Sequence, residues 1–97
     1  MSVIEIMAFN LADGVTDSEF RIADSALQMR FAYQQPGIIR RTTGRAEDGA
    51  WLVMTLWSSH AQADASDSAG VDDDRVSRFK SMIDLQTVRV KRFDTLD

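Results

Sequence analysis

Residues 50–57, AWLVMTLW, are apolar on both sides of the β-strand that their pattern predicts. Successive side chains of a strand point to opposite faces of the sheet. One face would carry Trp51, Val53, Thr55 and Trp57, and the other Leu52, Met54 and Leu56. A strand of this kind must be covered on both faces, so it belongs in the middle of a sheet. Helices of the same chain can cover one face. The other apolar face must be covered by something else.

Three more strands are predicted around this one. Residues 3–11, VIEIMAFNL, are also apolar on both sides and end in the turn signal ADG. Residues 38–46 form a hairpin with 50–57 through a turn at Asp48–Gly49. Residues 86–94, QTVRVKRFD, alternate charged and apolar side chains, which is typical of a strand with one charged face.

The clearest predicted helix covers residues 16–35. Thr16 and Glu19 have the spacing of a capping box, and QQPG at 34–37 ends the helix because proline cannot continue it. Two apolar stripes follow from the helical period: Phe20, Ala23, Leu27 and Phe31, and beside them Ile22, Ala26, Met29 and Tyr33. The second stripe should pack on another helix or line a cavity. Arg30 lies between the stripes and either reaches water or points a cation into a pocket.

The second half of the chain predicts a short, weakly packed helix at 59–69 and a longer one at 72–84. Asp72, Asp73 and Asp74 begin the longer helix, where acids complement the helix dipole. Consecutive helical positions point in different directions, so these acids are not expected to bind a metal ion together.

The element order is therefore β-α-β-β-α-β, which predicts a ferredoxin-like α+β fold for a single domain, 1–97. Its four-stranded antiparallel sheet would carry the helices on one face. We assign Met7, Phe9, Leu52, Met54 and Leu56 to the other face. An exposed apolar face of this size predicts a homodimer joined sheet to sheet.

Composition narrows the functional classes. A net charge of −4 argues against a nucleic-acid surface, and VRVKR at 88–92 fits a strand better than a basic patch. The chain has no cysteine, which excludes disulfides, a thiolate nucleophile and cysteine metal sites. The sequence shows no signal peptide and no membrane-spanning run, so we expect a cytoplasmic protein.

From IEIMAFN through QQPGIIRRTT and WLVMTLWSS to VRVKRFDTLD, the chain resembles the dimeric α+β-barrel superfamily, and most of all its antibiotic-biosynthesis-monooxygenase branch. The resemblance implies a homodimer and an oxygenation that needs no cofactor, metal or flavin. In such monooxygenases an asparagine on the first strand and a tryptophan ending the third help to form the pocket, and Asn10 and Trp57 match these positions. The related haem degraders use a histidine on the second helix, and DRVSRFKSMID has none, which argues against haem degradation.

Each candidate site residue also has a structural interpretation. Trp57 either closes the core at a strand end or forms a pocket wall that stacks on an aromatic substrate. Asn10 either bonds to nearby backbone or binds a substrate oxygen. His60 either faces solvent or acts as a general base, and Tyr33 and Arg30 are further candidates for binding. In an ideal antiparallel register Asn10 lies nearer Trp51, and Trp57 nearer Ile4, so Asn10 and Trp57 share a pocket only if the strands are offset or the cavity is long.

Two functions remain open at this point. The first is a cofactor-independent monooxygenase-like enzyme that acts on a flat aromatic or polyketide-like small molecule. The second is a non-catalytic dimeric module that binds a small apolar molecule or has a structural role. A cavity lined by Trp57, Asn10 and Tyr33 with a convergent polar group would favour the enzyme, and a filled core would favour the module.

Overall fold

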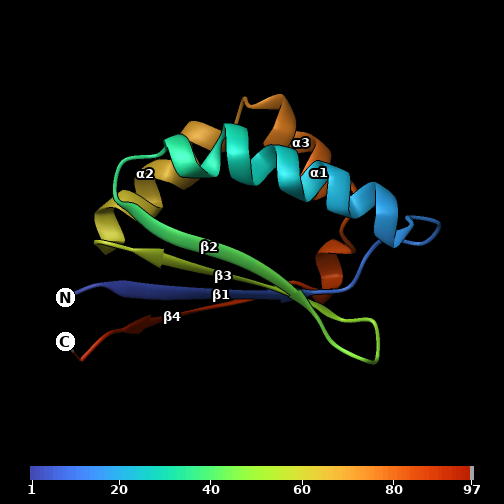
Figure 1. Cartoon of the computed structure of the whole chain (residues 1–97), viewed down its shortest axis with the longest axis horizontal. Helices are drawn as coiled ribbons and strands as arrows, with labels where there is room; N and C mark the ends of the chain where they lie inside the picture. Colours follow the sequence, from blue (N-terminus) through green and yellow to red (C-terminus); the bar gives the residue numbers. More distant parts are fainter. Residues whose placement is uncertain (97) are drawn as a thin grey trace.

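Within residues 1–96, four antiparallel strands form one sheet in the order β2-β3-β1-β4, and all three α-helices lie on one side of it (Figure 1). The computed structural model describes residues 1–96. The strands are β1 (Val3–Phe9), β2 (Ile38–Arg45), β3 (Trp51–Trp57) and β4 (Arg89–Asp94). The helices are α1 (Asp17–Arg30), α2 (His60–Gly70) and α3 (Asp74–Ser81), with 3-10 turns η1 (Ala32–Gln34) and η2 (Leu85–Thr87). The expected ferredoxin-like fold is confirmed.

The helices differ in length from the prediction. The segment predicted as a short helix at 59–69 is α2, which has 11 residues, whereas α3 has only 8. The predicted 72–84 helix ends early because the chain then runs beside the end of β1, where Ile83 forms a β-bridge with Leu11. No helix within residues 1–96 is long and apolar enough to cross a membrane.

Local sequence signals fix the ends of these elements. The Thr16 hydroxyl accepts from the Glu19 N–H, and the Glu19 carboxylate accepts from the Thr16 N–H, so the predicted capping box is present. The Ser59 side chain caps α2 and the Asp73 side chain caps α3. The hairpin turns as predicted, with Gly49 in the left-handed region at a φ of 92°.

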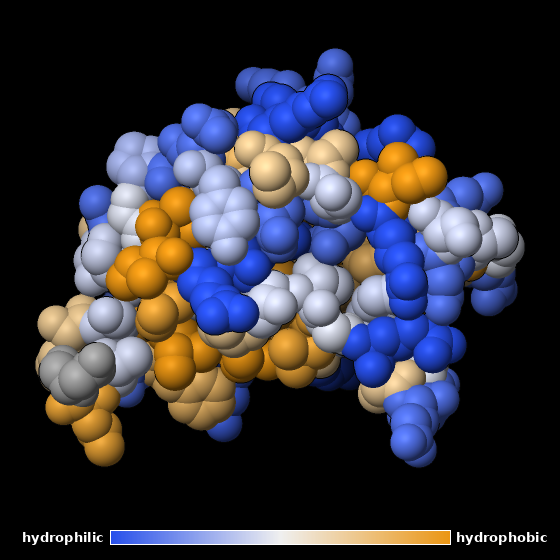
Figure 2. Space-filling view, in the orientation of Figure 1, coloured by the Kyte–Doolittle hydropathy of each residue, from blue (hydrophilic) through white to orange (hydrophobic). Residues whose placement is uncertain are grey.

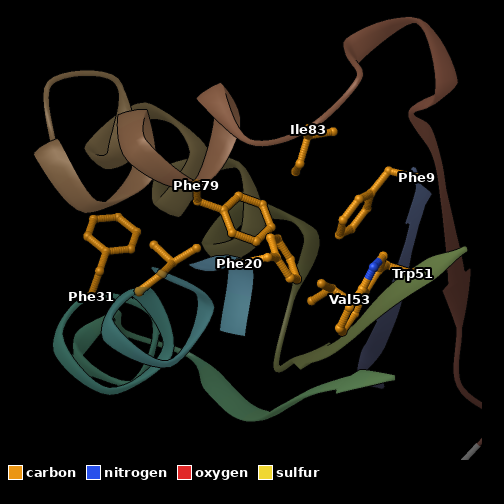
Figure 3. Close-up of a cluster of buried hydrophobic side chains, with 8 residues drawn as sticks. Phe9, Phe20, Phe31, Trp51, Val53, Phe79 and Ile83 are labelled. Atoms are coloured by element: carbon orange, nitrogen blue, oxygen red, sulfur yellow. The ribbon is translucent and has the colours of Figure 1, made fainter. Parts of the chain in front are cut away.

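The core lies between the sheet and the helices (Figure 3). The first stripe of α1 is buried there, and Phe20 at its centre is fully inaccessible to solvent. The Phe20 ring lies 4.8 Å from the Trp51 ring and 5.6 Å from the Phe9 ring, measured between centroids. The second stripe was predicted to pack on another helix or line a cavity. Instead, Ile22 and Met29 are 63% and 61% exposed and border a surface groove. The sheet and α3 cover only the first stripe.

The assignment of Met7 and Phe9 to the open face of the sheet is wrong. Phe9 pairs with Trp51 and Met7 pairs with Val53, and residues paired across antiparallel strands point to the same face. Phe9 is therefore buried under the helices and Met7 packs against the same cluster. The open face instead carries Ile4, Ile6 and Ala8 from β1, beside the correctly assigned Leu52, Met54 and Leu56.

Candidate functional site

A cavity of about 200 Å³ lies between the sheet and the helices. Aromatic and aliphatic side chains form most of its wall, among them Phe31, Val53, Trp57 and Phe79. Six polar side chains also line it: Glu5, Arg41, Thr55, Ser66, Asp67 and Lys80. Ligand sites commonly have this composition, with apolar walls and a few polar groups that orient the bound molecule.

The cavity exists because α2 brings small residues to the sheet. Its buried positions are Ala63, Ser66 and Gly70, and Ala63 packs against Trp57 and Val3. Small residues leave the space between helix and sheet unfilled. A Cβ added to Gly70 would lie 3.2 Å from a methyl of Val76 and 3.5 Å from the Phe31 ring, so the helices approach each other closely at this position.

The floor of the cavity includes a row of polar residues that crosses the sheet. Arg41 of β2 pairs with Thr55 of β3, Thr55 pairs with Glu5 of β1, and Glu5 pairs with Arg92 of β4. All four therefore point toward the helices. Arg41 and Thr55 are only 6% and 7% exposed, whereas the side chains of Glu5 and Arg92 retain about a fifth of their exposure. The buried end of the row is thus the β2 end.

Arg41 is a buried cation held on several sides. Its Nη2 donates to Asp24 Oδ1 at 2.7 Å, and its Nη1 donates to Gln28 Oε1 at 3.1 Å and Thr43 Oγ1 at 3.3 Å. The guanidinium carbon also lies 5.7 Å from the centroid of the Phe79 ring. These contacts connect β2 to α1 and fix the guanidinium beside the cavity.

At the other end of the row, Arg92 holds three acids together. It bonds to Glu5 and Asp64 at 2.8 Å and lies 3.6 Å from Asp67. The hydrogen bonds that Arg92 donates to the Glu5 and Asp64 carboxylates raise the pKa of Arg92. Partial burial raises the pKa of Asp67, the negative charge of Glu5 adds to that rise, and Arg92 opposes it. The Asp67 side chain itself is 74% exposed, so it borders the cavity from the solvent side.

Trp57 lies where the sequence predicts, facing the helices and lining the cavity. It is 5% exposed, and its indole N–H is buried without a hydrogen-bond partner in residues 1–96. The Trp51 indole N–H is buried in the same way. An unpaired N–H next to a cavity is a donor that a bound molecule could satisfy.

Asn10 is exposed and does not line the cavity. Its backbone N–H donates to Thr87 Oγ1 and its backbone carbonyl accepts from the Asp84 N–H. The register pairs Trp57 with Val3 and Trp51 with Phe9, so Asn10 and Trp57 stand at opposite ends of β1 and β3. The structure does not bring these two candidates into one pocket.

The three further candidates also lie outside the cavity wall. The Tyr33 hydroxyl accepts from the Arg41 N–H at 2.9 Å and donates to the Arg41 carbonyl at 3.0 Å. Arg30 is exposed and lines a shallow groove on the outer surface of α1. His60 begins α2, is exposed, and its Nε2 lies 2.7 Å from Asp94 Oδ1.

Sequence reasoning missed the polar residues that do line the cavity. Glu5 and Arg41 could have been recognised as charges on strand faces that point toward the core, a placement that needs a compensating partner. Ser66 and Asp67 on α2 carried no comparable signal. Within residues 1–96, no group of three or more histidines and acids has the arrangement needed to hold a metal ion.

No protein-family model and no curated protein matches this chain. Solved structures do match its fold. SnoaB, a cofactor-independent oxygenase from Streptomyces nogalater, is 17% identical with a TM-score of 0.81, over 99% of this chain and 94% of SnoaB. A putative antibiotic biosynthesis monooxygenase from Caulobacter crescentus is 13% identical with a TM-score of 0.80, over 99% and 91% of the two chains. A dimeric ferredoxin-like protein of unknown function from Thermobifida fusca is 15% identical with a TM-score of 0.77, over 98% and 92%.

Proposed function

We propose that this chain, which has the ferredoxin-like fold of the antibiotic-biosynthesis-monooxygenase structures, is a cofactor-independent monooxygenase-like enzyme that acts on a small, flat, oxygenated aromatic molecule. The observation that carries the proposal is the cavity beside Trp57, which is walled by apolar and aromatic groups and contains buried polar side chains. A core that served stability alone would be filled, because unfilled volume costs packing energy.

The cavity volume limits the size of the substrate. A closed apolar cavity of about 150 Å³ accommodates a benzene ring. The cavity of about 200 Å³ therefore suits one substituted ring or two fused rings. A longer polyketide-like molecule would have to leave part of its length outside.

The proposed chemistry uses the substrate as its own reductant. Loss of a proton from a CH₂ group next to the aromatic ring gives a carbanion, O₂ adds to that carbon as a hydroperoxide, and loss of water leaves a carbonyl. One oxygen atom enters the product and the other leaves as water. Asp67, which lines the cavity with a raised pKa, is the side chain that we assign as the proton acceptor.

Binding and turnover can be tested on the same panel of compounds. We expect 1-naphthol and 1-tetralone to raise the thermal unfolding temperature, because a molecule that binds only the folded state stabilises it. Three-ring 1,8-dihydroxyanthrone should bind more weakly. Oxygen uptake, measured with an oxygen electrode, should follow addition of a bound substrate that has an acidic CH₂ group.

A matched pair of variants locates the binding. Ser66→Leu should fill the cavity and abolish both the thermal shift and the oxygen uptake, whereas Ser68→Leu, at an exposed position of the same helix, should change neither. Binding without oxygen uptake would favour the alternative, a non-catalytic dimeric module. Binding that persists in Ser66→Leu would show that the cavity is not the site.

The proposed assembly is a homodimer through the open face of the sheet. Apolar side chains gather along the underside of the sheet, away from the helices (Figure 2), and Leu52 and Phe93 are 39% and 45% exposed. The Thermobifida fusca protein of the same fold is dimeric. We expect an interface above about 1,000 Å². Met54→Asp should shift the elution volume toward monomer or cause aggregation, whereas Ile22→Asp on the outer face of α1 should leave the elution volume unchanged.

A further inference from the structure

We infer that Arg41 binds an oxygen anion of the molecule in the cavity, so that this molecule is an aromatic carboxylate, phenolate or enolate. The inference rests on the proposed function of the cavity and names the class of molecule that it takes. It also moves the role of oxyanion partner from Asn10, which lies outside the cavity, to a residue of the cavity wall.

The hydrogen bonds of Arg41 leave donors for such an oxygen. A guanidinium has five N–H groups. Three of them donate within residues 1–96, to Gln28, Thr43 and Asp24. The other two have no acceptor within residues 1–96, and because Arg41 lines the cavity we infer that they can reach an acceptor there. Guanidinium geometry suits a two-oxygen group such as a carboxylate.

The surroundings of Arg41 favour an anion over a neutral group. Lys80 adds a second cation to the cavity wall. Of the two acids in that wall, Glu5 is paired with Arg92, and Asp67 lies 3.6 Å from the same arginine. The Trp57 indole N–H adds a neutral donor that has no partner among residues 1–96. Hydrogen bonds from a charged donor to a charged acceptor are the strong ones in a desolvated site.

Asp24 is the acid that bonds directly to Arg41. The two side chains are 13% and 5% exposed, and the bond between them is 2.7 Å long. A purely structural role would make this pair a tie between α1 and β2 that has no effect on ligand choice. A binding role predicts that removing the Asp24 charge strengthens the binding of anions, because the guanidinium is then less neutralised.

Calorimetric titrations at pH 8 with two pairs of compounds test the inference. The carboxylate pair is 1-hydroxy-2-naphthoate and its methyl ester, and the phenolate pair is 4-nitrophenol and 4-nitroanisole. We expect at least one anion to bind about 10-fold or more tightly than its neutral partner, the size of one charge-assisted hydrogen bond. The two pairs distinguish a carboxylate site from a phenolate site.

Variants assign the preference to Arg41. The ratio of the affinity for an anion to the affinity for its neutral partner should fall to about 1 in Arg41→Met. The same ratio should rise in Asp24→Asn. If Arg41→Met does not fold because Asp24 is left unpaired, the double variant Arg41→Met/Asp24→Leu replaces the buried pair with apolar groups that such sites often tolerate. A preference that survives in the double variant would overturn the inference.

The outcome for the native protein separates the two proposals. Equal binding of anions and their neutral partners would overturn the role of Arg41 and leave the cavity as a binding site for neutral aromatics. The absence of binding for all four compounds would contradict the inference and the proposed function together.

Discussion

The two tryptophans of β3 point to the same side of the sheet, yet their surroundings differ. Trp51 and Trp57 are 4% and 5% exposed, and both indole N–H groups lack partners in residues 1–96. Trp51 packs against Phe20 within the main aromatic cluster, whereas Trp57 contacts Val3 and Ala63 and lines the cavity. Burial alone therefore does not distinguish a core tryptophan from one in a binding site.

The residues that the helices contribute explain the difference. At the Trp51 end, α1 supplies Phe20, whose ring centroid lies 5.4 Å from that of Phe79 of α3. Phe79 reaches both ends, because its ring also borders the cavity. At the Trp57 end, α2 supplies Ala63, Ser66 and Gly70. The strand presents an indole at both ends, and the size of the facing helical side chains decides which end is filled.

The largest expected effect on stability comes from a substitution at the Trp51 end, where side chains fill the core. Phe20→Ala should lower the free energy of unfolding by about 3–5 kcal/mol, because it removes the ring at the centre of the cluster and leaves a void. Urea unfolding followed by circular dichroism measures the loss. Ile22→Ala, two positions along the same helix but exposed, should stay within about 0.5 kcal/mol of the native protein. Equal losses in the two variants would contradict the contrast between the ends.

Exchanging each tryptophan for phenylalanine sharpens the comparison. Trp57→Phe should weaken binding of an aromatic ligand about 10-fold and change stability little, because Trp57 lines the cavity. Trp51→Phe should lower stability by about 1–3 kcal/mol and leave the affinity unchanged. Calorimetric titration with 1-hydroxy-2-naphthoate and urea unfolding measure the two quantities. Ligand affinity that falls more in Trp51→Phe would reverse the assignment of the two ends.

The sequence predicted most of the fold because its signals were local. Alternation along residues 50–57 gave the faces of β3, and the Thr16–Glu19 spacing gave the start of α1. The error at Met7 and Phe9 arose because both faces of β1 are apolar, so periodicity could not say which face the helices cover. Pairing with β3 removes that ambiguity, because a residue of β1 faces the same way as its partner.

The candidate site was harder to predict because long-range pairing builds it. Arg41, Thr55 and Glu5 are neighbours only after three strands align. Trp57 could be predicted to face the helices from its own strand. The cavity next to it depends on Ser66 and Gly70, which in the sequence look like ordinary residues of a weak helix.

A smaller effect on stability is expected from changing Asp73, the residue that caps α3. This helix carries Phe79. The Arg75 side chain and backbone N–H groups donate to the Asp73 carboxylate and lower its pKa from the usual 3.8 to about 2. Because folding lowers the pKa of Asp73, its ionised carboxylate stabilises the folded protein above about pH 4. This stabilisation is lost as the pH falls toward 2.

Comparison with Asp73→Asn tests this pH dependence, because asparagine keeps the capping oxygen and removes the charge. At pH 6 the native protein should have a higher thermal unfolding temperature than Asp73→Asn. At pH 2 the difference between the two unfolding temperatures should be small. If the difference between the unfolding temperatures is the same at pH 6 and at pH 2, the Asp73 charge does not contribute to stability.

The smallest effect is expected at His60, which follows Trp57 by only three residues but faces away from the cavity. Its ring and the Asp94 carboxylate form an exposed pair, and such pairs contribute about 0–1 kcal/mol. His60→Ala should therefore change the rate of oxygen uptake less than about 2-fold, whereas loss of a general base costs about 100-fold or more. Asp67→Asn, which alters a residue of the cavity wall, is the matched comparison and should show the larger loss. A large loss in His60→Ala with a nearly normal Asp67→Asn would transfer the role of base to the histidine, and would require α2 to turn its first residue toward Trp57.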